Sequence, residues 1–283
     1  MPARVQPTAR QVRLGAELRK LREAAGQTSR QAAALLGTNP AQMSQIEAGN
    51  AGVSGERVRK LAVQYSCADA ELIDALMAMA TDRTRGWWEE YRDVLPLAFH
   101  DLAELEHHAR FMWVAGAVYV PGLLQTEEYA RAVYEFWNPG LPERDVQLRV
   151  ENRLRRAVVL TREGAVPYKA MLHESVLRTR VADRRVARDQ LDWILHMSER
   201  SNITVRVIPF DVDGFGGAGM GMLYAGGPVA ALDTVQQDTP SGAEYVDDAD
   251  RLRAVRHMYG KVEAASLDPT RSRDYIRRLA KEL

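Results

Sequence analysis

The fold of the N-terminal quarter is decided by the stretch TSRQAAALLGTNPAQMSQIEAG, which occupies residues 28–49. Thr28 is followed three places on by Gln31, a capping-box spacing that begins a helix. Gly37 supplies the permissive backbone with which that helix can end. The first half of the stretch therefore predicts a short helix that closes on a glycine.

The second half of the stretch predicts another short helix. Asn39 can accept a hydrogen bond from the free amides of its first turn, and Pro40 stands where a missing amide costs nothing. Gly49 ends this helix. Helices of this length do not persist alone, so both must pack on a shared core. The apolar residues that can meet there are Val12, Leu14, Leu18, Leu21, Ala25, Ala33, Leu36, Met43, Ile46, Val58, Leu61 and Ala62.

Two short helices in this order form a helix-turn-helix, and over residues 12–65 the chain resembles the XRE family of repressors, most distinctively in the string MSQIEAG. The resemblance implies that Arg22 and Glu47 pair in a structural role and that residues 40–48 are the recognition helix. Gln45 is the strongest candidate for a contact with a base edge, because glutamine can form two hydrogen bonds with adenine. All the outward-facing candidates are Ala41, Gln42, Ser44 and Gln45.

The charge of this region favours DNA as its partner. The first eighty residues hold ten Lys or Arg against seven Asp or Glu, whereas the whole chain has 38 of each. Because one such domain binds weakly, we expect a homodimer on operator half-sites about 34 Å apart. A helix-turn-helix that only mediates protein contacts is the alternative. The candidates for phosphate contacts are Arg30, Asn39, Asn50, Arg57 and Lys60.

The composition is that of a globular protein. The chain has 283 residues, of which 46% are hydrophobic and 27% charged, enough for two domains. It lacks a run of about 18 apolar residues and residues 1–11 are polar, so we expect a cytoplasmic protein without a membrane segment. The lone Cys67 cannot form an internal disulfide, and we expect a buried, inert thiol rather than a redox sensor.

A polar break divides the chain. Residues 81–86 form an expected linker between a helix-turn-helix domain, residues 1–80, and a larger region, residues 87–283. Helical patterns and β-branched runs alternate irregularly in the larger region, which predicts an α+β domain behind a mainly α N-terminal domain. The expected strands are 114–120, 168–172, 203–208, 220–225 and 229–234. The expected helices include one capped by Thr126 and the segments 145–160, 173–177, 186–197, 247–258 and 271–283.

The larger region carries a second resemblance. Its strings RGWW at 85–88, VPGLLQTEEYARA at 120–132, RDQL at 188–191 and VRVIPF at 205–210 look like the C-terminal domain of unknown function that follows XRE domains in many actinobacterial regulators. That family is described as antitoxin-like and is often encoded beside a small partner protein. The resemblance implies a partner-binding or effector-binding module and gives no catalytic residues. Candidate pocket-lining residues, each of which fits a core position better, are Trp87, Trp88, Trp113, Tyr119 and Phe210.

Signals of an enzyme or a metal site are weak. Residues 214–219 have the spacing of a dinucleotide-binding loop, but the residues that follow suit strands and turns, so we expect a plain loop. Residues 211–214 begin like a calcium loop and lack its later carboxylates. The six histidines are scattered, and we expect no metal and no cofactor. Arg149, Arg153, Arg155 and Arg156 suggest either a second DNA contact or, as nearby acids favour, a solvated or ion-pairing helix face.

Two functions follow from these patterns. The first is a cytoplasmic, dimeric, sequence-specific DNA-binding transcriptional regulator, whose larger domain senses a small-molecule effector or a partner. The alternative is an antitoxin-like interaction module that sequesters a small protein encoded nearby and binds double-stranded DNA mainly for autoregulation. We do not expect an enzyme.

Overall fold

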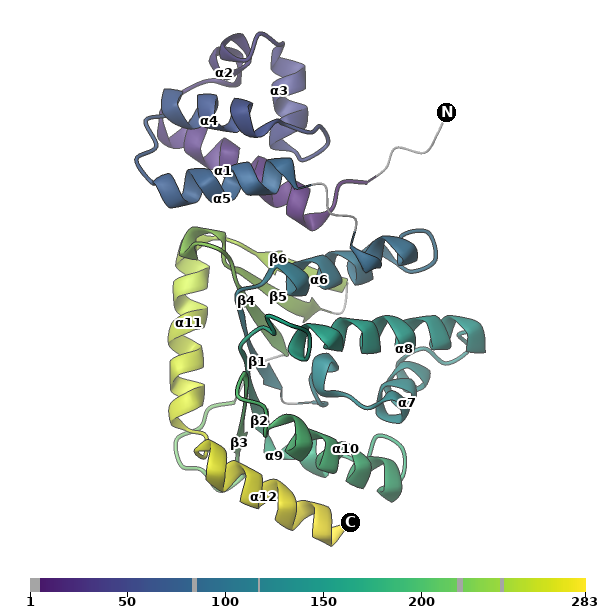
Figure 1. Ribbon diagram of the computed structural model, residues 1–283. Coiled ribbons are helices and arrows are strands. Elements are labelled where there is room, and N and C mark those ends of the chain that lie inside the picture. The colour runs from purple at the N-terminus through teal and green to yellow at the C-terminus, as the bar shows by residue number, and fades with distance from the viewer. Residues whose placement is uncertain (1–5, 83–85, 117, 218–220, 240–241) are drawn as a thin grey trace. The chain divides into compact units, whose positions relative to one another are not determined.

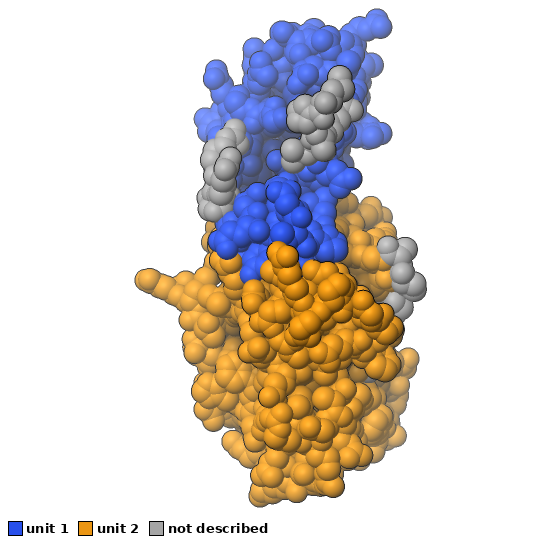
Figure 2. Space-filling view, turned by 90° about the vertical axis from the view of Figure 1, so that its right-hand side faces the viewer, with its two compact units in different colours: residues 1–105 blue, residues 106–283 orange. Residues whose placement is uncertain are grey.

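The computed structural model describes residues 6–82, 86–116, 118–217, 221–239 and 242–283. Its internal contacts divide the chain into two compact units, Met1–Leu105 and Glu106–Leu283 (Figure 2). The expected linker at residues 81–86 falls largely outside the described residues and stays a prediction. Within the described ranges, no helix is both long enough and apolar enough to cross a membrane.

The first unit is built from short, well-capped helices. Each of its first five helices has a side chain that accepts a hydrogen bond from the backbone of the first turn, supplied in order by Thr8, Thr28, Asn39, Ser54 and Asp69. These caps place the helix starts where the chain leaves a turn. The helices are α1 (Ala9–Ala24), α2 (Ser29–Leu35), α3 (Pro40–Glu47), α4 (Gly55–Gln64) and α5 (Ala70–Thr81), followed by the 3₁₀ helix η1 (Trp87–Tyr91) and by α6 (Leu97–His108).

A single apolar core holds α1 to α5 together. Leu18, Met43, Ile46, Leu61 and Leu76 are all buried there, and removing side chains of this size from water supplies most of the stability of such short helices. Two expectations about this region were wrong. Val12 is 43% exposed instead of buried, because it lies on the side of α1 away from that core. The thiol of Cys67 is partly exposed instead of buried.

The second unit is organised by one mixed sheet with the strand order β3-β2-β1-β4-β5-β6 (Figure 1). β1, β2 and β3 run parallel, and β4, β5 and β6 join them through antiparallel pairs. The predicted fold class, a mainly α N-terminal domain followed by an α+β domain, is confirmed. The strands are β1 (Phe111–Gly116), β2 (Tyr168–His173), β3 (Ile203–Ile208), β4 (Met222–Gly226), β5 (Thr234–Thr239) and β6 (Gly242–Val246).

Helices cover both faces of this sheet. Figure 1 shows α11 along one face and α7, α8 and α10 on the other. The α11 side is closed by Leu252, Tyr259 and Val262, which pack against Met222 and Tyr224 of β4. The elements are the 3₁₀ helix η2 (Gly122–Leu124), α7 (Glu127–Trp137), α8 (Glu143–Ala157), η3 (Val158–Leu160), α9 (Glu174–Arg178), α10 (Arg184–Met197), η4 (Ala230–Leu232), α11 (Ala249–Ala264) and α12 (Pro269–Glu282).

Two strand predictions were wrong, and one strand was missed. The strand expected at 114–120 is β1 (Phe111–Gly116), since backbone pairing with β2 and β4 begins earlier. The apolar run 229–234 forms the 3₁₀ helix η4 and only the start of β5, because the carboxylate of Asp233 closes a turn by accepting hydrogen bonds from Gly227 N and the Tyr224 hydroxyl. β6 was not expected. Its sequence is polar, and pairing with β5 makes it a strand.

Candidate nucleic-acid interface

The two helices of the helix-turn-helix, α2 and α3, begin at the expected N-cap residues. Thr28 and Gln31 form a reciprocal capping box, in which Gln31 N donates to the Thr28 hydroxyl at 3.3 Å and Thr28 N donates to the Gln31 side chain at 2.8 Å. Asn39 Oδ1 accepts a hydrogen bond from Gln42 N at 2.8 Å. Between the helices Gly37 has a φ of +65°, a left-handed conformation that favours glycine. Local chemistry alone therefore defines the start of α2, its end and the start of α3.

The orientation of α3 depends on a close backbone contact that the sequence patterns did not reveal. A Cβ atom on Gly15 of α1 would lie only 2.5 Å from the carbonyl oxygen of Glu47 and 2.6 Å from that of Ile46. Gly49 has a φ of +76°, and a Cβ there would lie 2.7 Å from the backbone nitrogen of Val12. Glycine at both positions lets α1 touch the end of α3, which fixes the direction in which the recognition helix points.

An ion pair joins the same two helices. Arg22 donates from Nε to Glu47 Oε1 at 2.6 Å and from Nη2 to Glu47 Oε2 at 2.9 Å, and its Nη1 donates to the carbonyl of Gln27 at 2.7 Å. Both side chains are at most 10% exposed. The hydrogen bond with Glu47 raises the pKa of Arg22. The residues that the XRE resemblance pairs are thus in contact, and they are turned into the domain rather than toward a ligand.

The four candidate base-edge residues lie on the side of α3 away from the core. Ala41, Gln42 and Ser44 are exposed and Gln45 is half-buried. The Ser44 hydroxyl donates to the carbonyl of Pro40 at 3.0 Å, so its proton is used within the helix and its oxygen lone pairs remain. In the part of the chain that the structure describes, the side-chain amides of Gln42 and Gln45 make no hydrogen bond. Both amides are therefore available for bases.

Cationic side chains flank this face. Arg30 on α2 and both Arg57 and Lys60 on α4 are exposed, and none of them forms an ion pair with a described residue. Asn39 uses its carbonyl oxygen as a helix cap, which leaves its amide nitrogen for a phosphate oxygen. Asn50 is exposed as well. The five phosphate candidates thus keep at least one free donor each.

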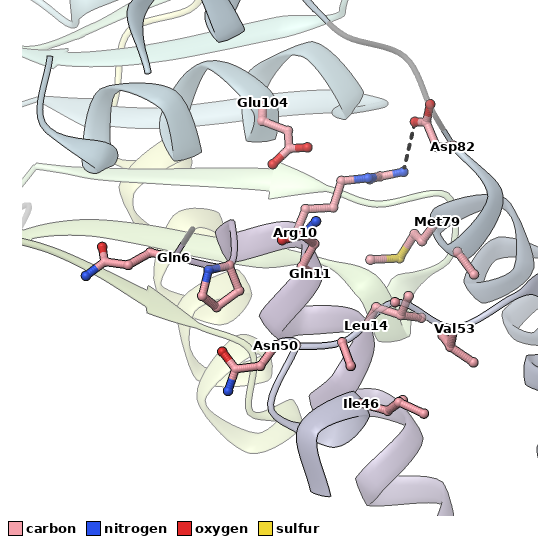
Figure 3. Close-up of a pocket in the computed structure, with 15 residues that line it drawn as sticks. Gln6, Arg10, Gln11, Leu14, Ile46, Asn50, Val53, Met79, Asp82 and Glu104 are labelled. Carbon is pink, nitrogen blue, oxygen red and sulfur yellow. Dashed lines mark ion pairs between the residues drawn. The ribbon is translucent and has the colours of Figure 1, made fainter. Parts of the chain in front are cut away.

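Asn50 also lines a cavity of about 310 Å³ within the first unit (Figure 3). Arg10 extends into it from α1 and pairs with Asp82 at 3.7 Å. Glu104 of α6 points into the same space (Figure 3). Burial lowers the pKa of Arg10 and raises that of Glu104. The lining mixes the charged side chains of Arg10, Asp82 and Glu104 with apolar residues of α1, α3 and α5, so it differs from the mainly apolar lining of a typical small-molecule pocket.

The structure divides the five candidate pocket-lining aromatics among four packing groups, with Trp87 and Trp88 together in one of them. Trp88 is buried in the first unit, with its ring edge-on to His100, and Trp87 packs beside it. Trp113 stacks on Tyr224 in the core under α11. Phe210 is 59% exposed, and its ring packs edge-on with that of His173. Tyr119, half-buried after β1, donates a hydrogen bond to Asp238 at 3.4 Å.

One group of potential metal ligands escaped the sequence reasoning. Side-chain atoms of His100, Asp101 and Glu104 on α6 lie within 4.8 Å of one another. His100 Nε2 also lies 2.7 Å from Glu89, whose carboxylate accepts two hydrogen bonds from Arg92 at 2.9 Å. Burial lowers the pKa of His100, but hydrogen bonding to Asp101 and Glu89 outweighs this effect, so the pKa is raised. A His-Asp-x-x-Glu spacing on one helix was the available signal. As the side chains stand, His100 pairs with Glu89 and Asp101.

Two of the four arginines singled out on α8 make side-chain contacts within the second unit. Arg156 is buried and donates two hydrogen bonds of 2.7 Å to Glu106, and Arg153 donates to Gln125. Of the two interpretations of this helix, the intramolecular one fits these contacts, and a second DNA contact does not.

Comparisons with known proteins agree with the two parts of the chain. The model of a helix-turn-helix domain matches residues 13–76. The model of a domain of unknown function, DUF5753, matches residues 99–278. No curated protein and no solved structure matches the chain. Both resemblances noted in the sequence, a helix-turn-helix regulator and a C-terminal domain of unknown function, are confirmed at this level, whereas the assignment to the XRE family stays a prediction.

Proposed function

Because the chain belongs to the family defined by the domain of unknown function DUF5753 and carries a helix-turn-helix domain in front of it, we propose that it is a sequence-specific DNA-binding transcriptional regulator. The observation that carries this proposal is the outer face of α3. Its two glutamine amides are unengaged, and the Arg22–Glu47 pair holds the helix from behind. A rigid helix with free amides on its outer face suits the major groove, which admits one α-helix.

Each outward residue of α3 suits a particular contact. Gln42 and Gln45 can donate to N7 and accept from N6 of adenine, and the methyl group of Ala41 can pack on the methyl group of thymine. Ser44, whose proton is bound to Pro40, would act as an acceptor. Such a surface reads few bases, so the shape of the DNA and the spacing of half-sites would add to specificity.

Phosphate contacts would position the domain on the duplex. Arg30, Arg57 and Lys60, which are exposed and form no ion pair with a described residue, can each neutralise a phosphate and release a counterion. Because a single domain with so few contacts binds weakly, the working form would be a homodimer in the cytoplasm, with half-sites about 34 Å apart on a palindromic operator. Sedimentation of the free protein and of its operator complex would test this stoichiometry.

A gel-shift titration with the DNA upstream of the gene tests base reading by α3. Replacing Gln45 with Ala should cost about 1–3 kcal/mol of discrimination between operator and unrelated DNA. Gln64→Ala is the matched control, because Gln64 is an exposed glutamine of the same domain outside α3. Equal operator affinity of wild type and Gln45→Ala would exclude Gln45 as a reader.

The second unit would then modulate DNA binding by taking up a small effector or a protein, and it would not be catalytic. The antitoxin-like alternative is favoured by Phe136 and Trp137 at the end of α7, which are 73% and 63% exposed. Paired aromatics at a surface are typical of protein contacts. Co-expression with the product of the neighbouring small gene separates the two roles, since the alternative requires a stable complex that Phe136→Ser weakens. A Val63→Ser control alters an exposed apolar residue of α4 instead.

A further inference from the structure

The string at residues 120–132 folds into a cradle for one arginine. Gln125 is buried; its Nε2 donates to the carbonyl of Val120 at 2.6 Å, and its Oε1 accepts a hydrogen bond from Arg153 Nη1 of α8. The hydroxyl of Tyr129 accepts a hydrogen bond from Val120 N at 3.2 Å. These bonds fold residues 120–129 back on themselves. The side-chain oxygen Oε1 of Gln125 is thereby held beside the guanidinium of Arg153.

The cradle is anchored from behind by α10. Gln190 is buried, accepts a hydrogen bond from Thr126 N at 2.8 Å and donates one to the carbonyl of Leu124 at 2.7 Å. A single glutamine thus satisfies both ends of the turn between η2 and α7. Its two bonds leave the string little freedom to move, which is the preorganisation that a binding site needs.

The cradle follows β1, the strand at which the strand order reverses, since β2 and β3 lie on one side of β1 and β4 lies on the other. β1 is parallel to β2 and antiparallel to β4, and the chain leaves the sheet at the carboxyl end of β1 to enter the string at Val120. In sheets with parallel strands, ligands bind outside the carboxyl ends of the strands, at the point where the connectivity changes direction. The position of Arg153 is therefore a favourable one for a ligand.

Arg153 has no carboxylate partner among the described residues. The nearby carboxylate of Glu106 is already engaged by Arg156, which donates both of its hydrogen bonds to it at 2.7 Å. Arg153 contacts the neutral Gln125 and lies over the ring of Tyr134, 4.2 Å from its centroid. Its Nε is sealed from solvent and makes no hydrogen bond. Burial lowers the pKa of Arg153.

A guanidinium that is partly removed from water and has no counterion destabilises the folded protein unless an anion binds to it. A buried charge that lacks a counterion loses hydration without an ionic gain. The Nε atom of Arg153 is sealed from solvent, but the residue as a whole is partly exposed, so a ligand from solution can reach its exposed part.

We propose that Arg153 binds the anionic group, a carboxylate or a phosphate, of a small ligand held between the cradle and α8. The planar guanidinium can present two parallel N–H groups to either anion, which a lysine cannot do. The rings of Tyr134 and of Tyr119, whose hydroxyl is bonded to Asp238, suit an aromatic body next to the acid. An effect of this ligand on DNA binding rests on the regulatory function proposed above.

Calorimetric titration of the full-length protein tests the site with three probes that share a phenyl ring: benzoate, phenyl phosphate and benzamide, the neutral counterpart of benzoate. We expect at least one acid to bind at least tenfold more tightly than benzamide, and the better acid identifies the group recognised. Arg153→Gln should abolish the preference, and Arg153→Lys should weaken it. Arg144→Gln, which alters an exposed arginine in the first turn of α8, should retain wild-type affinity.

Other results would overturn the site. These are failure of both acids to bind the wild type, equal binding of benzamide, or unchanged acid binding by Arg153→Gln and Arg153→Lys variants with wild-type circular dichroism. A gel shift with and without the bound acid separates this site from the regulatory role. Acid binding that leaves operator affinity unchanged supports the site and overturns sensing. Operator binding by a protein that binds neither acid overturns the site and leaves the DNA-binding function standing.

Discussion

Arg22 of α1 and Glu47 at the end of α3 form a two-pronged ion pair, with N···O distances of 2.6 and 2.9 Å, that is almost closed to solvent. The pair is 25 residues apart in sequence and bridges the helix that supports the domain and the helix that faces the ligand. By fixing the end of α3, the pair also fixes the direction in which the outer face of this helix points. Stability of the domain and affinity for DNA should therefore depend on the same contact.

Replacing Arg22 with Met should lower the free energy of unfolding of the helix-turn-helix domain by about 3–5 kcal/mol, because the Glu47 carboxylate stays buried without its partner. Denaturant unfolding measures this loss. The double variant Arg22→Met with Glu47→Leu should recover most of it, since an apolar pair leaves no orphaned charge. A double variant as unstable as Arg22→Met alone would contradict this account.

Replacing Gly15 with Ala should separate α1 from the end of α3. The new Cβ would lie 2.5 Å from the Glu47 carbonyl oxygen, and overpacking of this kind costs about 1–3 kcal/mol. Thermal unfolding and operator affinity should both fall. Gly52→Ala is the matched control, because a Cβ there meets nothing within 4 Å. If both variants behave alike, the close approach has no energetic weight.

The salt dependence of operator binding should report the phosphate contacts one by one. Replacing Arg57 with Gln should reduce the slope of log Kd against log salt concentration by about one unit and weaken binding to all sequences alike. Fluorescence anisotropy at several salt concentrations measures the slope. Arg144→Gln removes the same charge from the second unit, and its slope should equal that of the wild type. An unaltered slope in Arg57→Gln would remove that residue from the interface.

Acid should weaken the network around α6. Hydrogen bonding from Arg92 lowers the pKa of Glu89 to about 2, from an ordinary value of 4.5. A carboxyl group with a depressed pKa stabilises the folded state above about pH 4.5, and this contribution is lost as pH falls toward 2. His100 has a raised pKa, so its contribution is complete below about pH 6.5 and is lost as pH rises through its folded value.

Measuring the free energy of unfolding from pH 2 to pH 8 checks the predicted direction of the pH dependence for both Glu89 and His100. The network should contribute most between about pH 4.5 and 6.5, where the carboxylate and the imidazolium are both charged. Glu89→Gln should flatten the acid limb of the stability curve, whereas Glu56→Gln, an exposed residue of α4, should leave it unaltered. An acid limb that Glu89→Gln does not change would assign the loss to other carboxyl groups.

The sequence alone determined the features that depend on neighbours within a turn or two. Thr28, Asn39 and Thr126 cap helices where their spacing predicted, since an N-cap needs only the amides of the next three residues. The strands β2 and β3 could be predicted from their own runs of apolar and β-branched residues. The helix-turn-helix, the α+β class of the second unit and the outward residues of α3 all followed from such local patterns.

Tertiary structure alone decided every feature that depends on distant partners. The polar β6 is a strand because β5 supplies its hydrogen bonds. Gly15 is required because the end of α3 arrives against it. In sequence, Arg153 and Arg156 belonged to one basic helix face. Glu106, 50 residues from Arg156 in sequence, pairs with it in the fold, so that Arg153 has no counterion among the described residues. Local hydrogen bonds can be inferred from the spacing of residues. Which of two arginines on one helix face gains a carboxylate partner depends on how distant segments meet in space.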